Sequence, residues 1–244
     1  MATLVSTADQ AAMCGVDVRL AMLARSPLFA GLDDAALERV NDRCHAMATA
    51  PGDVVYRKGE PAERLYVVAT GQLKLLEHDA SGGEVVHDLC VPGSFLGGAP
   101  TLGDVAHAHD ARALTHGCLL VLAAEVFEGI VRSEPTVALN ALTLTSQRLR
   151  DAERTVQALS RRPVETQLAT TLLRLAVRLG STDAPARRLE LALSQADLAA
   201  MSGTTPESVS RTFAAWQRRG LVARGRGWIE LKDRAALADL AEGR

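Results

Sequence analysis

The chain has 244 residues, 48% hydrophobic and 23% charged, with a net charge of −2, which excludes wholesale disorder and fits one large domain or two modest ones. Its longest apolar run, Cys118–Ala124, is far shorter than the ~20 residues of a membrane-spanning helix, and its first ten residues lack the segments of a secretory signal. Four scattered cysteines without a CxxC pair exclude a small disulfide-rich secreted domain, so we expect a cytoplasmic protein with no membrane association.

The N-terminal part is predicted to form two short helices and then a β domain. The helices are expected around Val18–Leu23 and Asp33–Arg43, and the second begins with acidic residues that suit a helix cap. From Cys44 to Leu122, short apolar runs alternate with turns that contain glycine. This pattern predicts a jelly-roll or barrel and indicates no function by itself. The runs are Val54–Tyr56, Leu65–Ala69, Leu73–Leu76, Glu84–Val91 and Cys118–Leu122.

A long helix is predicted from Pro135 to about Leu159, where the apolar pattern becomes helical. Two sets of residues repeat every seven positions and form an a/d seam compatible with a parallel coiled coil. The seam consists of Leu142, Leu149 and Val156 together with Ala138, Thr145, Ala152 and Leu159. It predicts a homodimer; the alternative is an amphipathic helix that packs only on its own β domain.

Charge is distributed unevenly along the chain. Residues 1–160 carry 13 Lys and Arg against 20 Asp and Glu, whereas residues 161–244 carry 14 against 9. The change falls at Arg161-Arg162-Pro163, where the proline disfavours a continuing helix. We therefore predict an acidic regulatory domain over 1–134, a dimerisation helix over 135–160, and a domain over 161–244 that meets a polyanion. The alternative is that the charge difference arises by chance on a solvated surface.

The C-terminal domain contains a helix-turn-helix pattern. Ser194 is predicted to cap a first helix, and Gly203 suits the left-handed residue that ends it. Thr205 is predicted to cap a second helix with Pro206 at its first position. The buried face of this second helix would consist of Val209, Phe213 and Trp216. Such a pair of helices is typical of proteins that bind the major groove of DNA.

The opposite face of the second helix carries Glu207, Ser210 and Arg211. Arginine binds guanine O6 and N7 with two hydrogen bonds, a carboxylate accepts from cytosine N4, and serine contacts thymine or phosphate. These residues therefore predict direct contacts with base edges of double-stranded DNA. The alternative is a solvated helix N-terminus, at which the helix dipole favours Glu207. Other predicted DNA-contacting residues are Ser194, Gln195, Thr204, Thr205, Ser208 and Arg218.

A β-hairpin is predicted directly after the second helix. Two apolar arms, Leu221–Ala223 and Trp228–Leu231, enclose Arg224-Gly225-Arg226-Gly227. Arg224 and Arg226 at such a tip would lie on DNA phosphates. A hairpin in this position is the wing of a winged helix.

These features together resemble the CRP/FNR family of bacterial transcription regulators over nearly the whole chain. The resemblance rests on Ser26–Leu32, Gly71–Lys74 and Gly93–Gly97, on the long helix and on the winged helix. It implies an α+β chain with an N-terminal β-roll of the cyclic-nucleotide-binding type, a long dimerisation helix and a C-terminal winged helix-turn-helix. It also implies a homodimer that binds a two-fold symmetric DNA site near promoters and recruits RNA polymerase as an activator.

Within this family, Glu207, Ser210 and Arg211 are similar to the E-x-x-S-R pattern of the FNR-like branch. That resemblance implies a half-site similar to TTGAT. The cyclic-AMP branch usually has an arginine before the glutamate and glycine in place of the serine, whereas this chain has Pro206 and Ser210.

The effector is left open by the sequence. Cyclic AMP is disfavoured because no Arg or Lys lies between Gly97 and Arg112, and a buried phosphate without a cation is heavily penalised. An iron–sulfur cluster is disfavoured because it needs four thiolates and only Cys14 lies near the N-terminus, where that branch gathers its ligands. Cys44 and Cys90 are instead expected to be buried thiols.

Haem is a third candidate, by analogy with the branches that sense nitric oxide and carbon monoxide. His107 and His109 occupy the segment that replaces the phosphate-binding motif, and His87 and His116 lie nearby in the sequence. A regulator without an effector, or one controlled by a thiol such as Cys14, is the other hypothesis. The expected effector pocket consists of Phe95, Leu96, Gly97, Gly98, His107, His109 and His116.

Two other classes of protein are alternatives to a DNA-binding regulator. The pair His107 and His109 suggests a cupin-like metal enzyme, but the further ligands that such a site needs are missing. The usual enzyme motifs, such as Walker A, HExxH and GxSxG, do not occur. An interaction adaptor with a degenerate winged helix would bind DNA without sequence preference, and substitution of Arg211 would then change little.

Overall fold

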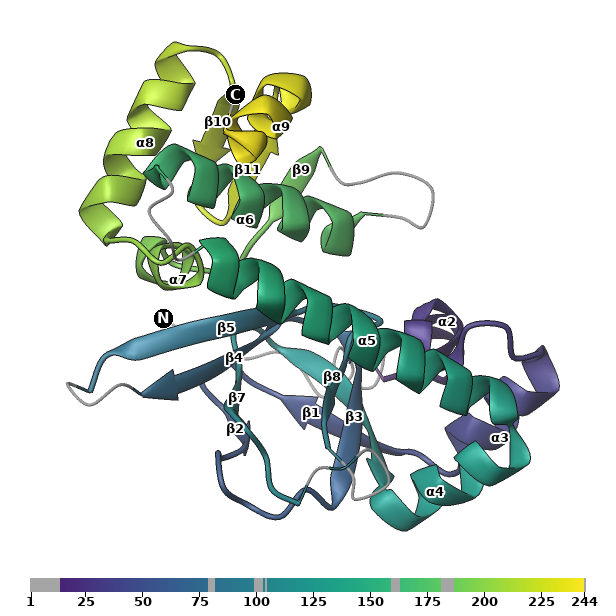
Figure 1. Ribbon diagram of the computed structural model, residues 1–244. Helices are drawn as coiled ribbons and strands as arrows, with labels where there is room; N and C mark the ends of the chain where they lie inside the picture. The colour runs from purple at the N-terminus through teal and green to yellow at the C-terminus, as the bar shows by residue number, and fades with distance from the viewer. Residues whose placement is uncertain are drawn as a thin grey trace. The chain divides into compact units, whose positions relative to one another are not determined.

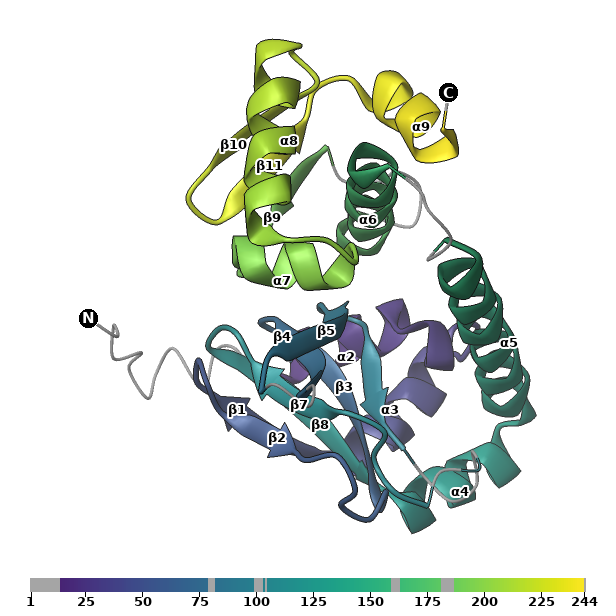
Figure 2. The same cartoon turned by 60° about the vertical axis from the view of Figure 1, so that its left-hand side comes forward.

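The computed structural model describes residues 14–78, 82–98, 103, 105–158, 163–180 and 187–243. Contacts divide the chain into two compact units, with boundaries after Leu75, Leu89 and Asp151. Figures 1 and 2 show the elements of both units. No helix among the described residues is long and apolar enough to cross a membrane.

Two four-stranded sheets form the β-roll. Their strand orders are β1-β8-β3-β6 and β2-β7-β4-β5, so neighbours in the sheet are often distant in sequence. The first sheet is antiparallel throughout, with β8 paired to β1 on one side and to β3 on the other. The strands are β1 (His45–Thr49), β2 (Val54–Tyr56), β3 (Arg64–Thr70), β4 (Leu73–His78), β5 (Glu84–Cys90), β6 (Phe95–Gly97), β7 (Asp110–Ala113) and β8 (Gly117–Ala123).

The inner faces of the two sheets share one apolar cluster. Tyr56, Leu73 and Ala111 come from one sheet, and Tyr66 and Leu119 come from the other. This sandwich of two sheets confirms the predicted β-roll. All five predicted apolar runs form strands, within one or two residues of their expected ends.

The sequence pattern does not predict strands β1, β6 and β7. β1 has the sequence HAMAT and is exposed along most of its length, and β6 has only three residues. β7 has alternating burial, but its buried positions are alanines, which have weak β propensity. These strands exist because their neighbours pair with them, and their own sequence carries little periodic signal.

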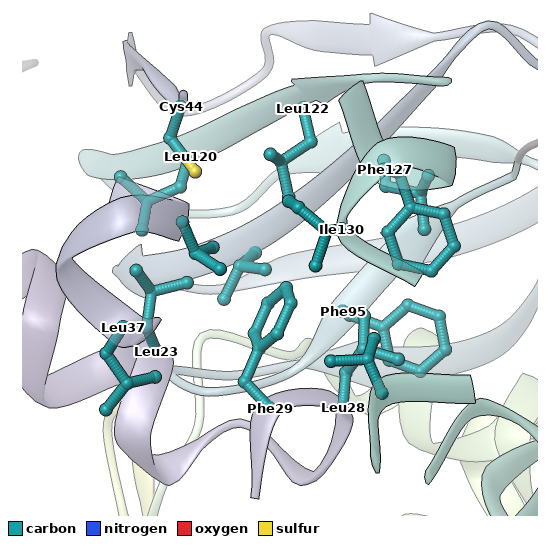
Figure 3. Packing of buried hydrophobic residues seen from close by; sticks show 14 of the residues in the cluster. Leu23, Leu28, Phe29, Leu37, Cys44, Phe95, Leu120, Leu122, Phe127 and Ile130 are labelled. Atoms are coloured by element: carbon teal, nitrogen blue, oxygen red, sulfur yellow. The ribbon is translucent and has the colours of Figure 1, made fainter. Parts of the chain in front are cut away.

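A second cluster covers the outer face of the β1-β8-β3-β6 sheet and is shown in Figure 3. Leu65, Leu120 and Leu122 project from the strands. Leu23 and Phe127 are among the side chains that the helices pack against them. The helices are α2 (Val16–Arg25), the 3₁₀ turn η1 (Pro27–Phe29), α3 (Asp34–Asp42) and α4 (Ala124–Ser133). The two predicted N-terminal helices correspond to α2 and α3, and Asp33 caps α3 by accepting a hydrogen bond from the Ala36 N–H at 2.7 Å.

The predicted long helix is α5 (Pro135–Ala158). Its first turns bury Val137 and Ala141 in the same cluster as Leu120 and Phe127. Among the seam residues, Leu142 and Thr145 are exposed, Ala138 is half-buried, and Leu149 is exposed on the next turns. The side chains of Ala152 and Val156, and all of Leu159, lie outside the described residues.

The C-terminal unit contains a three-stranded antiparallel sheet in the order β10-β11-β9. Helix α9 packs against α6, and α7 packs against α8. Leu172, Leu198, Phe213, Trp216 and Leu237 are among its buried apolar residues. The elements are α6 (Val164–Leu179), β9 (Arg188–Glu190), α7 (Gln195–Met201), α8 (Pro206–Arg218), β10 (Val222–Gly225), β11 (Trp228–Leu231) and α9 (Arg234–Glu242). This arrangement confirms the predicted winged helix.

Candidate nucleic-acid interface

The first helix of the helix-turn-helix begins with a capping box. The Asp197 N–H donates to Ser194 Oγ at 3.1 Å, and the Ser194 N–H donates to Asp197 Oδ2 at 2.8 Å. Ser194 Oγ also donates to Asp197 Oδ2 at 2.7 Å. The Ser194 hydroxyl therefore forms its hydrogen bonds within the cap, as predicted for an N-cap, whereas the side chain of the neighbouring Gln195 is exposed.

A hydrogen bond between two buried hydroxyl groups connects the turn between α7 and α8 to helix α6. Gly203 has φ +62°, the left-handed conformation predicted for it. Just before it, Ser202 Oγ donates to Thr171 Oγ1 on α6 at 3.1 Å, and both side chains are buried. The sequence did not single out this pair, because the two residues are 31 positions apart.

Helix α8 begins at Pro206, with Thr205 as its N-cap. Thr205 Oγ1 accepts from the Ser208 N–H at 3.2 Å, and a hydrogen bond of 3.1 Å joins the Thr205 and Ser208 hydroxyls. The predicted cap and the predicted position of Pro206 are both confirmed. Thr205 and Ser208 therefore orient the first turn of α8, and Thr204 lies half-buried in the turn before it.

The two faces of α8 differ sharply in burial. Val209, Phe213 and Trp216 are fully buried, and the Phe213 and Trp216 rings meet edge to face at 6.1 Å between centroids. On the other side, Glu207 and Arg211 are exposed and Ser210 is half-buried. Because the apolar face is anchored in the core, the first two turns of α8 present Glu207 and Arg211 to the surroundings.

Glu207 is held in its charged form. Hydrogen bonds from its own backbone N–H and from the Thr205 hydroxyl lower the pKa of the Glu207 carboxyl, and the positive charge of Arg211 adds to this effect. At neutral pH the side chain is therefore a hydrogen-bond acceptor, the form that would accept from cytosine N4.

The wing places its two arginines differently. β10 and β11 pair from Val222 opposite Leu231 to Gly225 opposite Trp228, so the tip consists of Arg226 and Gly227, and Arg226 is exposed. Arg224 belongs to β10 and is half-buried. Its guanidinium lies 4.9 Å from the Phe213 ring centroid, and its Nε donates to Gln217 Oε1 at 3.3 Å. The sequence placed both arginines at the tip, whereas the register puts Arg224 against α8.

Comparisons with known proteins agree with this geometry. The family model of the Crp-like helix-turn-helix domain matches residues 166–240, and that of the cyclic nucleotide-binding domain matches residues 47–134. The HTH-type transcriptional regulator Cmr of Mycobacterium tuberculosis is 31% identical over 193 residues, which cover 79% of this chain and 75% of Cmr. The chain belongs to the CRP/FNR family of transcription regulators.

Other relatives of this CRP/FNR-family regulator extend over most of its length. The cyclic AMP receptor protein of Thermus thermophilus is 29% identical over 218 residues, 89% of this chain and 98% of the relative. The structure of FixK2 from Bradyrhizobium japonicum shares the fold, with a TM-score of 0.72 and 24% identity over 81% of this chain and 96% of FixK2. The regulator is therefore a DNA-binding protein with a winged helix, as predicted from its sequence.

The residues expected to line the effector pocket are divided between two apolar clusters. Phe95 packs in the cluster under the helices, whereas Leu96 packs between the sheets with Tyr56 and Tyr66. Tyr56 joins two of the others, because its hydroxyl accepts from the Gly97 N–H at 3.1 Å and its ring stacks on His107 at 3.8 Å. The remaining members differ in burial: Gly98 is buried, and His109 and His116 are half-buried.

His107 has the surroundings of a structural histidine. Its side chain is 7% exposed, its backbone N–H donates to Glu60 O and its carbonyl accepts from the Gly59 N–H, both at 2.9 Å. One face of the imidazole stacks on Tyr56, while the His107 backbone holds the loop between β2 and β3 through Gly59 and Glu60. This geometry gives no support to His107 as a haem ligand. His87 pairs with Glu77 at 2.9 Å on the β4–β5 hairpin.

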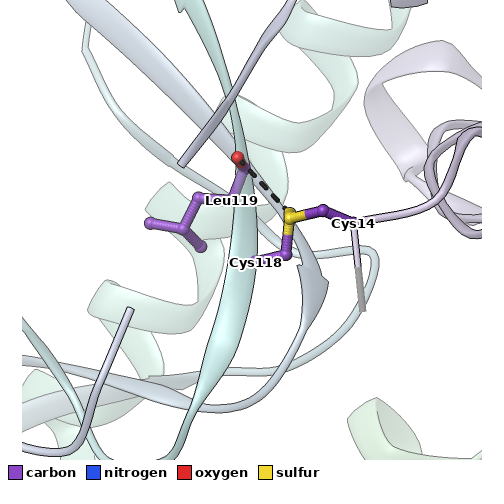
Figure 4. The surroundings of a disulfide bond; sticks show 3 residues. All are labelled: Cys14, Cys118 and Leu119. Carbon is purple, nitrogen blue, oxygen red and sulfur yellow. Dashed lines mark hydrogen bonds between the residues drawn. A yellow bond between two sulfur atoms is a disulfide. The ribbon is translucent and has the colours of Figure 1, made fainter. Parts of the chain in front are cut away.

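The cysteines form one disulfide and two buried thiols. Cys44 and Cys90 are buried, as predicted, and burial raises the pKa of the Cys44 thiol to about 12 against the opposing charge of Arg19. Cys14 and Cys118 are joined by a disulfide, shown in Figure 4. Two of the four thiolates that an iron–sulfur cluster would need are therefore bonded to each other. Sequence reasoning missed this pair, because a separation of 104 residues carries no pairing signal.

Proposed function

We propose that this regulator binds, as a homodimer, a two-fold symmetric DNA site with half-sites similar to TTGAT. The observation that carries the proposal is the division of α8 into a buried face and a face that presents Glu207 and Arg211. Arg211 would bind guanine through O6 and N7, Glu207 would accept from a cytosine N4, and Ser210 would contact thymine or phosphate.

Contacts to phosphates would fix the register of α8 in the groove. Gln195 at the start of α7, Arg218 at the end of α8 and Arg226 at the tip of the wing are all exposed. Such contacts position a protein on the duplex without reading its sequence. Arg224 would act differently, by holding β10 against α8.

The dimer would form along α5. Leu139, Leu142 and Leu149 are 65%, 65% and 61% exposed, values that are costly for large apolar side chains on a lone helix. Leu142 and Leu149 are one heptad apart, which matches the repeat of a parallel coiled coil. A two-fold axis along α5 would present two copies of α8 to adjacent turns of the major groove.

The remaining parts of the proposal follow the family resemblance. The β-roll over 1–134 would receive the signal, the helix over 135–160 would transmit it, and the domain over 161–244 would bind DNA in the cytoplasm. The regulator would recruit RNA polymerase from a promoter site. The signal would shift the population of chains that hold both copies of α8 in a DNA-competent position.

The proposal is tested with two DNA duplexes that differ only in the half-sites. One carries two TTGAT half-sites arranged as a palindrome with centres about 10 base pairs apart, and the other carries scrambled half-sites of the same composition. We expect the purified chain to bind the palindrome at least 1000-fold more tightly at physiological salt, measured by fluorescence anisotropy. Equal affinity for both duplexes would refute sequence-specific binding and favour the adaptor hypothesis.

A further inference from the structure

The disulfide joins the start of the described chain to the centre of a sheet. Cys14 lies two residues before α2, and Cys118 is the second residue of β8. Their Cα atoms are 5.7 Å apart, within the range that a disulfide spans without moving the backbone. Cys118 is fully buried and Cys14 is half-buried, so a reagent from solvent reaches the bond from the Cys14 side.

The bond is part of the cluster that supports α5. Cys118 sits on β8 between β1 and β3, opposite Ala48 on one side and Thr70 on the other. It belongs to the same apolar cluster as Leu120 and Leu122, and Cys14 packs against that cluster. Val137 and Ala141 of α5 are buried in it as well. The packing around the disulfide is therefore continuous with the packing under the first turns of α5.

The other two cysteines, Cys44 and Cys90, are not expected to react with thiols or oxidants. Cys44 and Cys90 are buried thiols outside the disulfide, and the raised pKa of Cys44 keeps it protonated at neutral pH. A protonated, buried thiol is neither a nucleophile nor an easy target of oxidants. Redox chemistry of the chain is thereby directed to Cys14 and Cys118.

A DNA-binding regulator acts in the compartment that contains the DNA, and thiol reductants keep that compartment reducing. Disulfides found in such places are usually transient and redox-sensing or catalytic. We propose that the Cys14–Cys118 disulfide is the signal input of this regulator, and that its reduction lowers the affinity for the operator. This inference rests on the proposed function and names its regulation.

The reduction is a thiol–disulfide exchange with a dithiol reductant. A reductant thiolate attacks Cys14 Sγ, and the bond to Cys118 Sγ breaks to leave a thiolate that takes up a proton. The second thiol of the reductant then attacks the mixed disulfide and releases Cys14 as a thiol. Two electrons and two protons pass to the protein, and the reductant becomes a disulfide. A low-molecular-weight disulfide, such as oxidised glutathione, reverses the reaction and recovers the same two electrons.

Reduction is expected to affect DNA binding because the disulfide links the segment before α2 to β8. α2 stays packed through Leu23, but the segment before it loses its covalent link to β8. The cross-link closes a 104-residue loop, so its loss lowers the free energy of unfolding by releasing the unfolded chain. In the folded chain, Cys14 is no longer tied to Cys118, and the apolar cluster that also buries Val137 and Ala141 loses this local constraint. Looser packing under α5 weakens the dimer seam above it, and the affinity of the dimer for DNA falls.

The test measures operator affinity in two redox states of the full chain. One sample is oxidised with oxidised glutathione and the other reduced with dithiothreitol, and each is titrated against the TTGAT palindrome. We expect reduction to weaken binding at least about tenfold and to lower the thermal midpoint by roughly 5–15 °C. A count of free thiols in denaturant confirms the states, with Cys44 and Cys90 reactive in both and Cys14 and Cys118 only after reduction.

Two variants separate the disulfide from general thiol effects. Cys14→Ser changes the half-buried partner and is expected to bind like the reduced wild type in both buffers. Cys90→Ala removes a buried thiol that is not part of the disulfide and is expected to keep the full redox response. Faster hydrogen exchange at Val137–Leu144 in the reduced wild type provides a readout that does not depend on DNA.

Each other result overturns a defined part of the inference. Equal affinity of the two redox states refutes the switch and leaves operator binding intact. A redox response that survives in Cys14→Ser assigns the signal elsewhere and refutes the role of this bond. Failure of both states to bind the palindrome, with the chain folded, refutes the proposed function and the switch together.

Discussion

Arg224 of the wing lies over the Phe213 ring of helix α8, with its guanidinium carbon 4.9 Å from the ring centroid and its Nε donating a hydrogen bond to Gln217 Oε1. Phe213 is also part of the buried face that anchors α8. One arginine therefore connects the strand that leads to the wing tip with the helix that presents Glu207 and Arg211.

This contact predicts different roles for the two arginines of the wing. Arg224→Ala is expected to lower the free energy of unfolding by about 0.5–1 kcal/mol, the value of a partly exposed cation–π contact, and to weaken operator binding without changing base preference. Arg226→Ala is the matched control, because its side chain is exposed at the tip. It is expected to leave stability unchanged and to reduce the slope of log affinity against log salt by about 1. Urea unfolding and salt-dependent anisotropy distinguish the two, and equal effects on both would contradict the assignment.

Arg211 is expected to read a guanine. Arg211→Ala should cost about 1–3 kcal/mol of binding free energy and relax the preference at the guanine of each half-site. Arg218→Ala, at the other end of α8, should weaken binding to all sequences alike. The measurement is the affinity of each variant for the palindrome and for duplexes substituted at the guanine. Unchanged base preference in Arg211→Ala would refute the base contact.

The pKa of Glu207 predicts how base preference depends on pH. Because the pKa is lowered by the Glu207 backbone N–H and the Thr205 hydroxyl, the carboxylate persists as the pH falls through the usual range of a glutamate. The favourable interaction is present above the ordinary pKa and is lost only as the pH falls through the lower value of the folded protein. Preference for the cytosine opposite Glu207 should therefore persist at pH 4.5, where an unshifted glutamate would be half protonated. Loss of this preference between pH 8 and pH 4.5 in the wild type, with no such change in Glu207→Gln, would contradict this.

The helix-turn-helix was accessible to sequence reasoning because its signals are local. Ser194 and Thr205 cap helices within three residues of themselves, and Gly203 adopts a conformation that glycine favours. The face of α8 follows from the helical period alone. Each of these features depends on residues that are close neighbours in the chain.

Features that depend on distant neighbours were missed. The disulfide of Cys14 and Cys118 and the hydroxyl pair of Ser202 and Thr171 form only after the chain has folded. The position of Arg224 depends on the register of a hairpin, and a shift of one residue would turn it to the other face. Short-range patterns contain none of this information.

The exposed leucines of α5 predict the position of the dimer interface. Leu149→Glu would place a charge in the seam and is expected to convert the dimer to a monomer and to abolish tight operator binding. Val177→Glu is a matched control, because Val177 is an equally exposed apolar residue, 62% against 61%, on α6 outside the seam. Sedimentation equilibrium checks both variants. A Leu149→Glu variant that remains dimeric would refute the proposed seam.

Gly71 is required where β3 turns into β4. Its φ is +86°, and a Cβ there would lie 2.8 Å from the His116 carbonyl oxygen and 2.9 Å from Gly117 Cα. Both are backbone atoms, so relieving these contacts would require a movement of the main chain. Gly59 has nearly the same φ, +84°, but open space around the position of its Cβ. Gly59→Ala is therefore expected to cost only the backbone strain, about 1–2 kcal/mol.

Gly71→Ala is expected to cost this strain and a further 1–3 kcal/mol or so for displacing the backbone before β8. Urea unfolding of the two variants measures the difference, since both substitutions change the conformational freedom of the unfolded chain in the same way. Equal stability of the two variants would show that the turn can open around the new methyl group. In that case the short distances to His116 and Gly117 would not explain why position 71 is a glycine.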